Sequence, residues 1–306
     1  MIHLKLDDVT YKYPHEGART VRIADLTLTP GLYYLYGANG SGKTMLLKGL
    51  AGLLTPAKGI VKLHRGNQAL DVAQYKWHMG YCPQEYALLE SLTVYAYLKY
   101  IAKMRFIPNQ LIPSRIDELL DTFQLKSMAR QKIDSLSIGQ KKRILLLQAL
   151  LADPDLLLLD EPLAHTDLHE YNMLSRLLAS EEGERIIIAS DHPISRQMDI
   201  SCRILFISEG QLKGPYDSEQ LKASLDNRIV TCRIPTTRWR EQLEKMSRVC
   251  SILSLKHGPE EVIFRVYLHA GKTSGSVPFL ANVEITTMED VYLCFQIPSV
   301  RDNMLR

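Results

Sequence analysis

The sequence lacks any apolar run long enough to cross a membrane. The nearest candidate, residues 145–159, is broken by Gln148 and by Asp153–Asp155, whereas a membrane-spanning helix needs about 20 consecutive apolar residues. The first residues, 1–5, show no apolar stretch of the kind that begins a secretory signal. We therefore expect that any role at a membrane requires a partner chain.

Cysteine is scarce, and charge of one sign does not dominate. The five cysteines are widely spaced and form no C-x-x-C pair, which argues against a zinc site or a disulfide framework and favours a reducing compartment. The net charge is only +3, from 37 Lys and Arg against 34 Asp and Glu, so we expect no nucleic-acid partner. The 306 residues are 46% hydrophobic, which suits one large domain or two to three lobes.

A glycine-rich segment, Gly37–Thr44, fits the pattern G-x-x-x-x-G-K-S/T without a mismatch. Residues 32–36 before it predict a short buried strand, and residues 45–51 after it have helical spacing, which is the context that this motif requires. Its glycines allow backbone N–H groups to turn toward an anion, and the helix start adds a positive dipole end. Lys43 would reach the β- and γ-phosphates of a nucleotide, and Thr44 would bind Mg²⁺. The nucleotide-binding candidates of this segment are Gly37, Asn39, Gly40, Ser41, Gly42, Lys43 and Thr44.

Four consecutive leucines, residues 156–159, end in Asp160 and Glu161. This run between turn formers predicts a central parallel strand that is buried on both faces, and ligands bind at the carboxyl ends of such strands. Asp160 is expected to hold Mg²⁺, and Glu161 to orient or deprotonate an attacking water. A second apolar run, 185–190, predicts another buried strand; His192 follows it, and the residues alone leave its role open between structural and catalytic.

Two further features are ambiguous from the residues alone. Ser137 is a good N-cap for the helix that follows, but Lys141–Arg143 then places three cations in its first turn, where the helix dipole favours acids. An anion docking at this helix start would explain the cations, and so would plain surface charge. Tyr13, at the end of a predicted strand, would either stack on an adenine ring or fill the rim of a small sheet.

The remaining pattern predicts the organisation of the chain. Strands are expected at 2–6, 9–13 and 22–29, helices from about 92 to 151, a linker over 213–227, and a small α+β region beyond it. The predicted fold is therefore α/β: a P-loop NTPase core with an N-terminal antiparallel β subdomain, a helical insertion and a small α+β C-terminal domain.

The motifs, taken in this order, resemble the nucleotide-binding subunit of ATP-binding cassette (ABC) transporters over residues 1–225. The resemblance implies a helical subdomain at about 86–151 and an accessory domain at 226–306. In the family's terms, the segments are Walker A at Gly37–Thr44, the Q-loop at Gln84, the signature at Leu136–Gln140, Walker B at Leu156–Asp160 with Glu161 as the catalytic carboxylate, the D-loop at Asp167, the switch histidine at His192 and the adenine-stacking aromatic at Tyr13.

This resemblance also implies a mechanism. Two copies of the chain would enclose two ATP, each bound by the Walker A segment of one copy and by Ser137, Gly139 and Gln140 of the other. The expected metal ligands are Thr44, Gln84 and Asp160, and the expected catalytic residues are Lys43, Gln84, Glu161 and His192. A separate transmembrane permease would dock on residues 85–98 and hold the dimer at the cytoplasmic face of the membrane. Residues 287–292 are similar to the tail of exporter-type subunits, which implies export.

One residue departs from the family pattern. Ile138 occupies the place of the first glycine in the signature, and because a β-branched residue rarely adopts a positive φ, its backbone should be ordinary or the loop altered. A working but slow site is then expected. Two alternatives remain: a soluble ABC-type ATPase unconnected with transport, and a regulatory cassette that binds ATP with little turnover. The soluble DNA-repair type carries a long coiled coil, whereas the insertion here is about 90 residues without sustained heptads.

Overall fold

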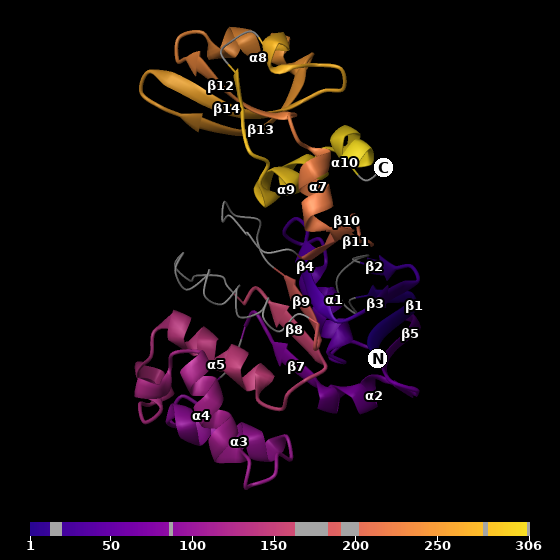
Figure 1. The fold of residues 1–306 in the computed structure, drawn as a ribbon, viewed down its shortest axis with the longest axis vertical. Coiled ribbons are helices and arrows are strands. Elements are labelled where there is room, and N and C mark those ends of the chain that lie inside the picture. Colours follow the sequence, from indigo (N-terminus) through magenta and orange to yellow (C-terminus); the bar gives the residue numbers. More distant parts are fainter. Residues whose placement is uncertain (13–19, 86–87, 163–182, 191–201, 278–280, 305–306) are drawn as a thin grey trace. The chain divides into compact units, whose positions relative to one another are not determined.

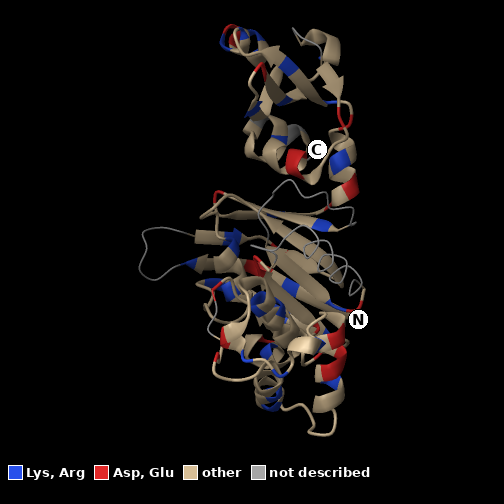
Figure 2. Ribbon diagram, turned by 90° about the vertical axis from the view of Figure 1, so that its left-hand side faces the viewer, with Lys and Arg blue, Asp and Glu red and all other residues tan. Residues whose placement is uncertain are grey.

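The computed structural model describes residues 1–12, 20–85, 88–162, 183–190, 202–277 and 281–304. They form two compact units, the first reaching Pro215 and the second beginning at Tyr216. Basic and acidic residues are interspersed over both units (Figure 2), in keeping with the nearly balanced charge of the sequence. The predicted α/β fold, with a core of parallel strands and a separate antiparallel sheet, is confirmed.

The first unit is built on one large mixed sheet with the order β6-β5-β1-β2-β11-β10-β4-β9-β8-β7, in which β3 also pairs with β1. The strands are β1 (Ile2–Lys12), β2 (Thr20–Ile23), β3 (Leu26–Leu28), β4 (Gly31–Tyr36), β5 (Lys58–Arg65), β6 (Gln68–Leu70), β7 (Met79–Cys82), β8 (Leu156–Asp160), β9 (Ile186–Ser190), β10 (Arg203–Ser208) and β11 (Gln211–Asp217). Strand β1 pairs antiparallel with β2, β3 and β5, whereas β10, β4, β9, β8 and β7 run parallel. The antiparallel part is the predicted N-terminal subdomain, and the parallel part is the core.

Burial follows from this arrangement. Every residue of β4, β8 and β9 is buried, as expected for central parallel strands covered on both faces. By contrast, β1 alternates between buried and exposed residues, as an antiparallel strand with one wet face does. Helix α1 (Lys43–Leu50) contacts β8 and β1, and its Met45 and Leu46 join the core beneath the sheet.

Three helices form the predicted insertion beside the β7 edge (Figure 1). They are α3 (Val94–Met104), α4 (Ile112–Thr122) and α5 (Ile138–Leu150). Helix α3 contacts α4 and α5, and α5 contacts β7 and β8. Between α2 (Val72–Tyr75) and β7 lies the single turn η1 (Lys76–His78), and two further 3₁₀ turns, η2 (Lys126–Met128) and η3 (Ile133–Ser135), precede α5.

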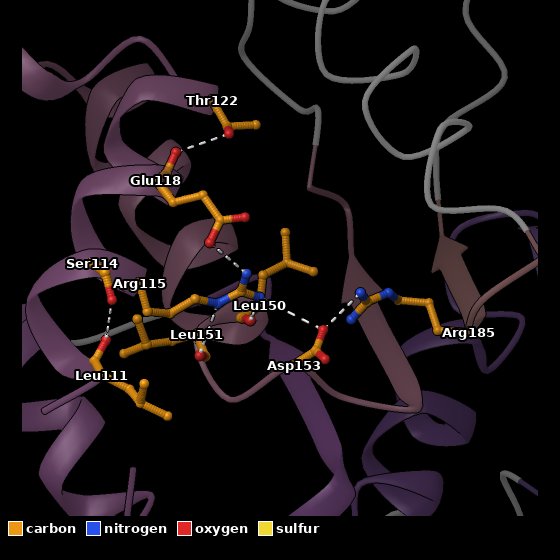
Figure 3. A network of polar contacts seen from close by, with 9 residues as sticks. All are labelled: Leu111, Ser114, Arg115, Glu118, Thr122, Leu150, Leu151, Asp153 and Arg185. Carbon is orange, nitrogen blue, oxygen red and sulfur yellow. Dashed lines mark hydrogen bonds and ion pairs between the residues drawn. The ribbon is translucent and has the colours of Figure 1, made fainter. Parts of the chain in front are cut away.

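An arginine network joins this insertion to the sheet (Figure 3). Arg115 of α4 donates from Nη2 to the carbonyl oxygen of Leu150 at 3.1 Å and lies 3.6 Å from Asp153 Oδ1. The same carboxylate oxygen accepts from Nη2 of Arg185, which precedes β9, at 2.9 Å. Asp153 thus connects an arginine of the insertion to an arginine of the sheet.

The second unit contains a four-stranded antiparallel sheet with the order β13-β14-β12-β15. Its elements are α7 (Ser218–Ser224), β12 (Ile229–Pro235), α8 (Trp239–Ser247), β13 (Cys250–His257), β14 (Glu261–Leu268), η4 (Ser274–Ser276), β15 (Ala281–Val283), α9 (Met288–Gln296) and α10 (Pro298–Met304). Helix α8 contacts β13, and α9 contacts α7 and α10. The unit has a core of its own, which includes Val230, Phe264 and Met246.

Three sequence predictions were wrong in detail. Residues 2–12 do not form two strands: β1 is continuous over Ile2–Lys12, with φ 44° at Asp8 and a shift in its register with β5 between Asp7 and Thr10. Residues 22–29 form two strands rather than one. The predicted linker over 213–227 is instead the end of β11 and helix α7, because Asp217 accepts hydrogen bonds from the N–H groups of Glu219 and Gln220 and Leu221 is buried.

Candidate nucleotide-binding site

The glycine-rich loop lies between β4 and α1, as predicted, and its geometry requires glycine at two positions. A Cβ atom at Gly37 would stand 2.5 Å from the carbonyl oxygen of Ile207 and 2.5 Å from Ser41 Oγ. Gly42 is the N-cap of α1 with φ 111°, and a Cβ there would meet Val21 Cγ2 at 2.3 Å. The loop is therefore held tightly against β10 and β2 by residues without side chains.

Two side chains of the loop are buried beneath it. Lys43 is 6% exposed, and its ammonium donates to the carbonyl oxygens of Gly37 at 2.7 Å and Ala38 at 3.3 Å. Ser41 Oγ is buried without a hydrogen-bond partner in the described part of the chain. Asn39 and Gly40, in contrast, are exposed. The loop thus has a cation bound to its carbonyl groups and a hydroxyl whose hydrogen bonding is incomplete.

The predicted metal-binding acid stands next to this loop. Strands β8 and β9 pair Asp160 with Ser190, and the Ser190 hydroxyl donates to Asp160 Oδ1 at 2.7 Å. Burial raises the pKa of Asp160, and hydrogen bonds from the hydroxyls of Ser190 and Thr44 partly oppose that rise. Thr44 of the loop and Asp160 of β8 are therefore neighbours, as the metal prediction requires.

Glu161 is held in an unusual backbone conformation. Its φ is 50°, which is uncommon for a residue other than glycine. Its N–H donates to Ser190 Oγ at 3.0 Å, and its carbonyl oxygen accepts from the ammonium of Lys142 at 3.0 Å. Its carboxylate Oε2 accepts from Gln84 Nε2 at 2.9 Å. The Q-loop residue, the signature helix and β9 all converge on this one acid.

Sequence reasoning missed the roles of Ser190 and Lys142. Ser190 could have been found, because parallel pairing of the two predicted strands aligns their last residues. Lys142 could not have been found, because its neighbours in the basic run are equally cationic. Only the fold buries Lys142, which is 7% exposed, against the backbone of Glu161.

The three cations of the basic run at the start of α5 have contacts within their own chain. Lys141 pairs with Glu90 at 2.7 Å, and Arg143 donates to the carbonyl oxygen of Phe123 at 3.5 Å. Lys142 binds the carbonyl oxygen of Glu161. Intrachain contacts are thus one explanation for the cations, and whether an anion also docks at this helix start stays a prediction.

The signature segment begins α5 with reciprocal capping. Ser137 Oγ accepts from the N–H of Gln140 at 3.2 Å, and Gln140 Oε1 accepts from the N–H of Ser137 at 2.9 Å. Ile138 is the first helical residue, is 63% exposed and has no positive φ. The isoleucine therefore fits an ordinary helix start, as expected; Ser137 beside it is exposed, and Gly139 is half-buried. Whether a second chain contacts this segment stays a prediction.

Three predicted site residues, Tyr13, Asp167 and His192, lie outside the described residues. One observation indicates that the remaining candidates fit a magnesium–nucleotide complex. Asp160 Oδ2 and Ser41 Oγ are both buried without hydrogen-bond partners in the described ranges. Such atoms cost free energy unless a ligand or water satisfies them. Carboxylate and hydroxyl oxygens are ligands that Mg²⁺ binds, and the backbone N–H groups of a glycine-rich loop bind phosphate.

Comparison with known proteins finds similar sequences. Residues 21–164 match the family model described as ABC transporter. The chain is 29% identical over 224 residues to the ABC-type organic anion transporter ABCA8A of Mus musculus, which covers 72% of this chain and 14% of that protein. It is 33% identical over 182 residues to the molybdate/tungstate import ATP-binding protein WtpC of Pyrococcus horikoshii, covering 59% and 52%. It is 26% identical over 269 residues to the uncharacterized ABC transporter ATP-binding protein YxlF of Bacillus subtilis, covering 85% and 88%.

Solved structures share the fold. One ATP-binding subunit of an ABC transporter superposes with a TM-score of 0.60 at 21% identity, covering 72% of this chain and 92% of the other. A putative ABC transporter ATP-binding protein from Pyrococcus furiosus gives 0.55 at 23% identity, covering 67% and 97%. The chain spans only a small part of the mouse protein and about half of the archaeal one. Residues 21–164 therefore resemble the ATP-binding domain of ABC transporters in sequence, and the fold is shared with solved ATP-binding subunits of such transporters.

Proposed function

We propose that this chain is the ATP-binding and ATP-hydrolysing subunit of an ABC transporter. It works as a homodimer that encloses two ATP and drives a separate transmembrane permease. The observation that carries the proposal is the convergence of Gln84, Lys142 and Ser190 on Glu161, next to Asp160 and the glycine loop. A protein that only binds nucleotide does not need an acid fixed in this way.

Each described residue then has a chemical role. Lys43 neutralises phosphate charge from within the loop, and the loop N–H groups bind phosphate oxygens. Mg²⁺, when bound, stabilises negative charge on the phosphates, and Thr44, Asp160 and Gln84 are the residues that would hold it. Glu161 orients the attacking water and accepts its proton, because its carboxylate is positioned by the Gln84 amide.

The other residues act across the dimer or outside the described ranges. Ser137, Gly139 and Gln140 of one copy contact the ATP of the other, for which the capped and exposed start of α5 is a suitable surface. Tyr13 stacks on adenine, Asp167 lies at the dimer contact and His192 contacts the γ-phosphate; these three roles rest on the family resemblance.

The transport role has support from the relatives. The names of similar proteins include an organic anion transporter and two import ATP-binding proteins, so they favour transport without giving its direction. Export rests on the resemblance of residues 287–292 to exporter tails. In the described part of the chain, no helix is long and apolar enough to cross a membrane. The proposal assigns membrane attachment to the permease, at the cytoplasmic face, as the family resemblance implies.

The test is the substitution Glu161→Gln, with Glu85→Gln as a control that removes a neighbouring exposed acid. We expect E161Q to bind ATP, to turn over at least about a hundredfold more slowly, and to accumulate as an ATP-bound dimer in size-exclusion chromatography. Hydrolysis by E161Q at the wild-type rate would overturn the role of Glu161. A wild-type chain that binds ATP but does not hydrolyse it, with or without permease, would favour the regulatory alternative.

A further inference from the structure

A second surface of the first unit has an unusual composition. Five large apolar side chains are exposed in the chain segments that form η1, the end of α3 and the connection to α4. They are Trp77 (50% exposed), Tyr100 (47%), Met104 (59%), Phe106 (78%) and Leu111 (56%). Single exposed apolar residues are normal, but a cluster marks an interaction site. We call this surface, together with the cations described below, the α3 patch.

The centre of the α3 patch is preformed. The rings of Trp77 and Phe106 pack edge to face with centroids 5.6 Å apart. Arg105 donates from Nη1 to the carbonyl oxygen of Lys76 at 3.1 Å. These contacts fix the turn η1 to the end of α3, although the two are almost 30 residues apart in sequence. The exposed rings therefore stay in place without a partner, and little conformational entropy would be lost when one binds.

The charged side chains of the segment that forms most of the α3 patch have one sign. Residues 91–116 contain no Asp or Glu, and Lys99 and Lys103 lie on the same exposed face of α3 as Tyr100 and Met104. Lys76 is also exposed, with its ammonium 5.8 Å from the centroid of the Trp77 ring. Glu90, the acid that precedes this segment, is already paired with Lys141 at 2.7 Å and does not neutralise these cations. Aromatic rings and cations without acids are the composition of surfaces that bind anionic membranes.

The α3 patch is separate from the nucleotide site. The turn η1 leads into the first residue of β7, while Gln84 follows its last residue. Four strand residues place these two ends about 13 Å apart. A surface beyond the far end of β7 is not needed to bind ATP, so it can act whether or not nucleotide is present.

We propose that the α3 patch binds anionic phospholipid directly, with Trp77 and Phe106 at the level of the headgroups and Lys76, Lys99 and Lys103 against their phosphates. The subunit then has its own contact with the membrane surface in addition to the permease. This goes beyond the proposed function and does not depend on ATP hydrolysis, so either can fail without the other.

The chain provides its own probe. It has only two tryptophans, Trp77 and Trp239, so Trp239→Phe leaves Trp77 as the sole tryptophan, whose emission is excited selectively over that of tyrosine. The full-length W239F protein is titrated with vesicles of phosphatidylcholine containing phosphatidylglycerol, and with phosphatidylcholine vesicles as the neutral comparison. We expect a blue shift of Trp77 emission and cosedimentation with the anionic vesicles only, both weakened by added salt.

Variants locate the contact. Lys99→Gln with Lys103→Gln should weaken vesicle binding by about fivefold for each lysine removed, and Phe106→Ser should weaken it further through lost apolar contact. The charge-matched control, Lys256→Gln with Lys272→Gln, and the apolar control, Ile285→Ser, change exposed residues of the second unit and should leave binding unchanged. ATPase activity of every variant in solution should remain at the wild-type level, which shows that it is folded.

Three outcomes would overturn the proposal. The first is no association with anionic vesicles at low salt. The second is association that the α3 patch variants and the second-unit controls weaken equally. The third is a Trp77 shift that occurs only with protein-containing membranes, which would identify the occupant as a protein, the permease included.

Discussion

At the residue scale, the candidate site contains two adjacent acids in different surroundings. Asp160 is 1% exposed, and burial raises its pKa, with one carboxylate oxygen lacking a hydrogen-bond partner among the described residues. Glu161 is partly exposed and bound through its N–H, carbonyl and carboxylate groups. The first arrangement costs stability until a cation arrives, whereas the second holds an acid in place.

Replacing Asp160 with Asn should therefore separate stability from activity. Because the variant removes a buried charge, the nucleotide-free protein should be more stable by roughly 1 kcal/mol, while ATPase activity is lost with the metal ligand. The sign of the pH dependence follows from the raised pKa: the folded state prefers the protonated acid. The difference in free energy of unfolding between Asp160→Asn and the wild type should therefore shrink as the pH falls through that raised pKa toward about 3.9, the value in the unfolded chain. Denaturant unfolding at several pH values measures this, and a gap that widens on acidification would contradict it.

Lys142 should act as a positioning residue for Glu161. Lys142→Met removes the ammonium that binds the Glu161 carbonyl, and because a charged hydrogen bond contributes about 1.5–3 kcal/mol, kcat should fall at least about tenfold. The KM for ATP should stay within about twofold, and Lys142→Arg should restore part of kcat. Lys141→Met is the matched control, since Lys141 pairs with Glu90 instead. Equal losses in both variants, or a change in KM alone, would count against this role.

At the scale of elements, two helix starts show how local sequence sets function and stability. Helix α5 begins with the reciprocal Ser137–Gln140 cap, which fixes the signature segment at the N-terminus of a helix. Helix α9 begins with a similar cap, in which Asp290 Oδ2 accepts from the N–H and the hydroxyl of Thr287 at 2.7 Å each. Asp290 is fully buried and also binds Nη2 of Arg265 on β14 at 2.7 Å. The segment that resembles an exporter tail is therefore, in structural terms, an anchored helix start.

Asp290→Ala should destabilise the second unit by about 3–5 kcal/mol, because it leaves Arg265 without its buried partner. Glu289→Gln, in the same helical turn, should change its free energy of unfolding by less than about 0.5 kcal/mol. Chemical denaturation followed by Trp239 fluorescence in a Trp77→Phe background reports on this unit. A small effect of D290A would mean that the ion pair is not structurally important.

At the scale of the whole molecule, the two units have separate hydrophobic cores. Only the first contains the loop, the acids and the signature. We propose, with the boundary near residue 216 rather than 225, that the second unit is an accessory domain. Ligand binding should then affect the two units unequally, since a ligand stabilises only the unit that binds it.

Calorimetry should show two unfolding transitions, and MgATP should raise only one. At a ligand concentration about 100 times Kd the gain is about 2.7 kcal/mol, which corresponds to roughly 5–10 °C for a unit of this size. Lys43→Ala, which removes the cation of the loop, should abolish the shift without removing the second transition. A single transition that MgATP moves as a whole would contradict independent units.

The sequence by itself determined the local chemistry. Gly37–Thr44 specifies its own loop, because glycines and a following helix are local requirements, and the four leucines before Asp160 specify a strand buried on both faces. The N-cap of Ser137 was predictable for the same reason. These features depend on residues that are close together along the chain.

Only the tertiary structure decided which distant groups meet. The choice of Lys142 over Lys141 and Arg143, and the pairing of Ser190 with Asp160, depend on how α5 and β9 pack against β8. The sequence predicts a linker where helix α7 (Ser218–Ser224) lies, because so short an apolar pattern becomes a stable helix only when α7 packs on α9. Burial is a property of the folded chain, so the pKa of Asp160 and the exposure of Trp77 and Phe106 could not be predicted from composition or spacing.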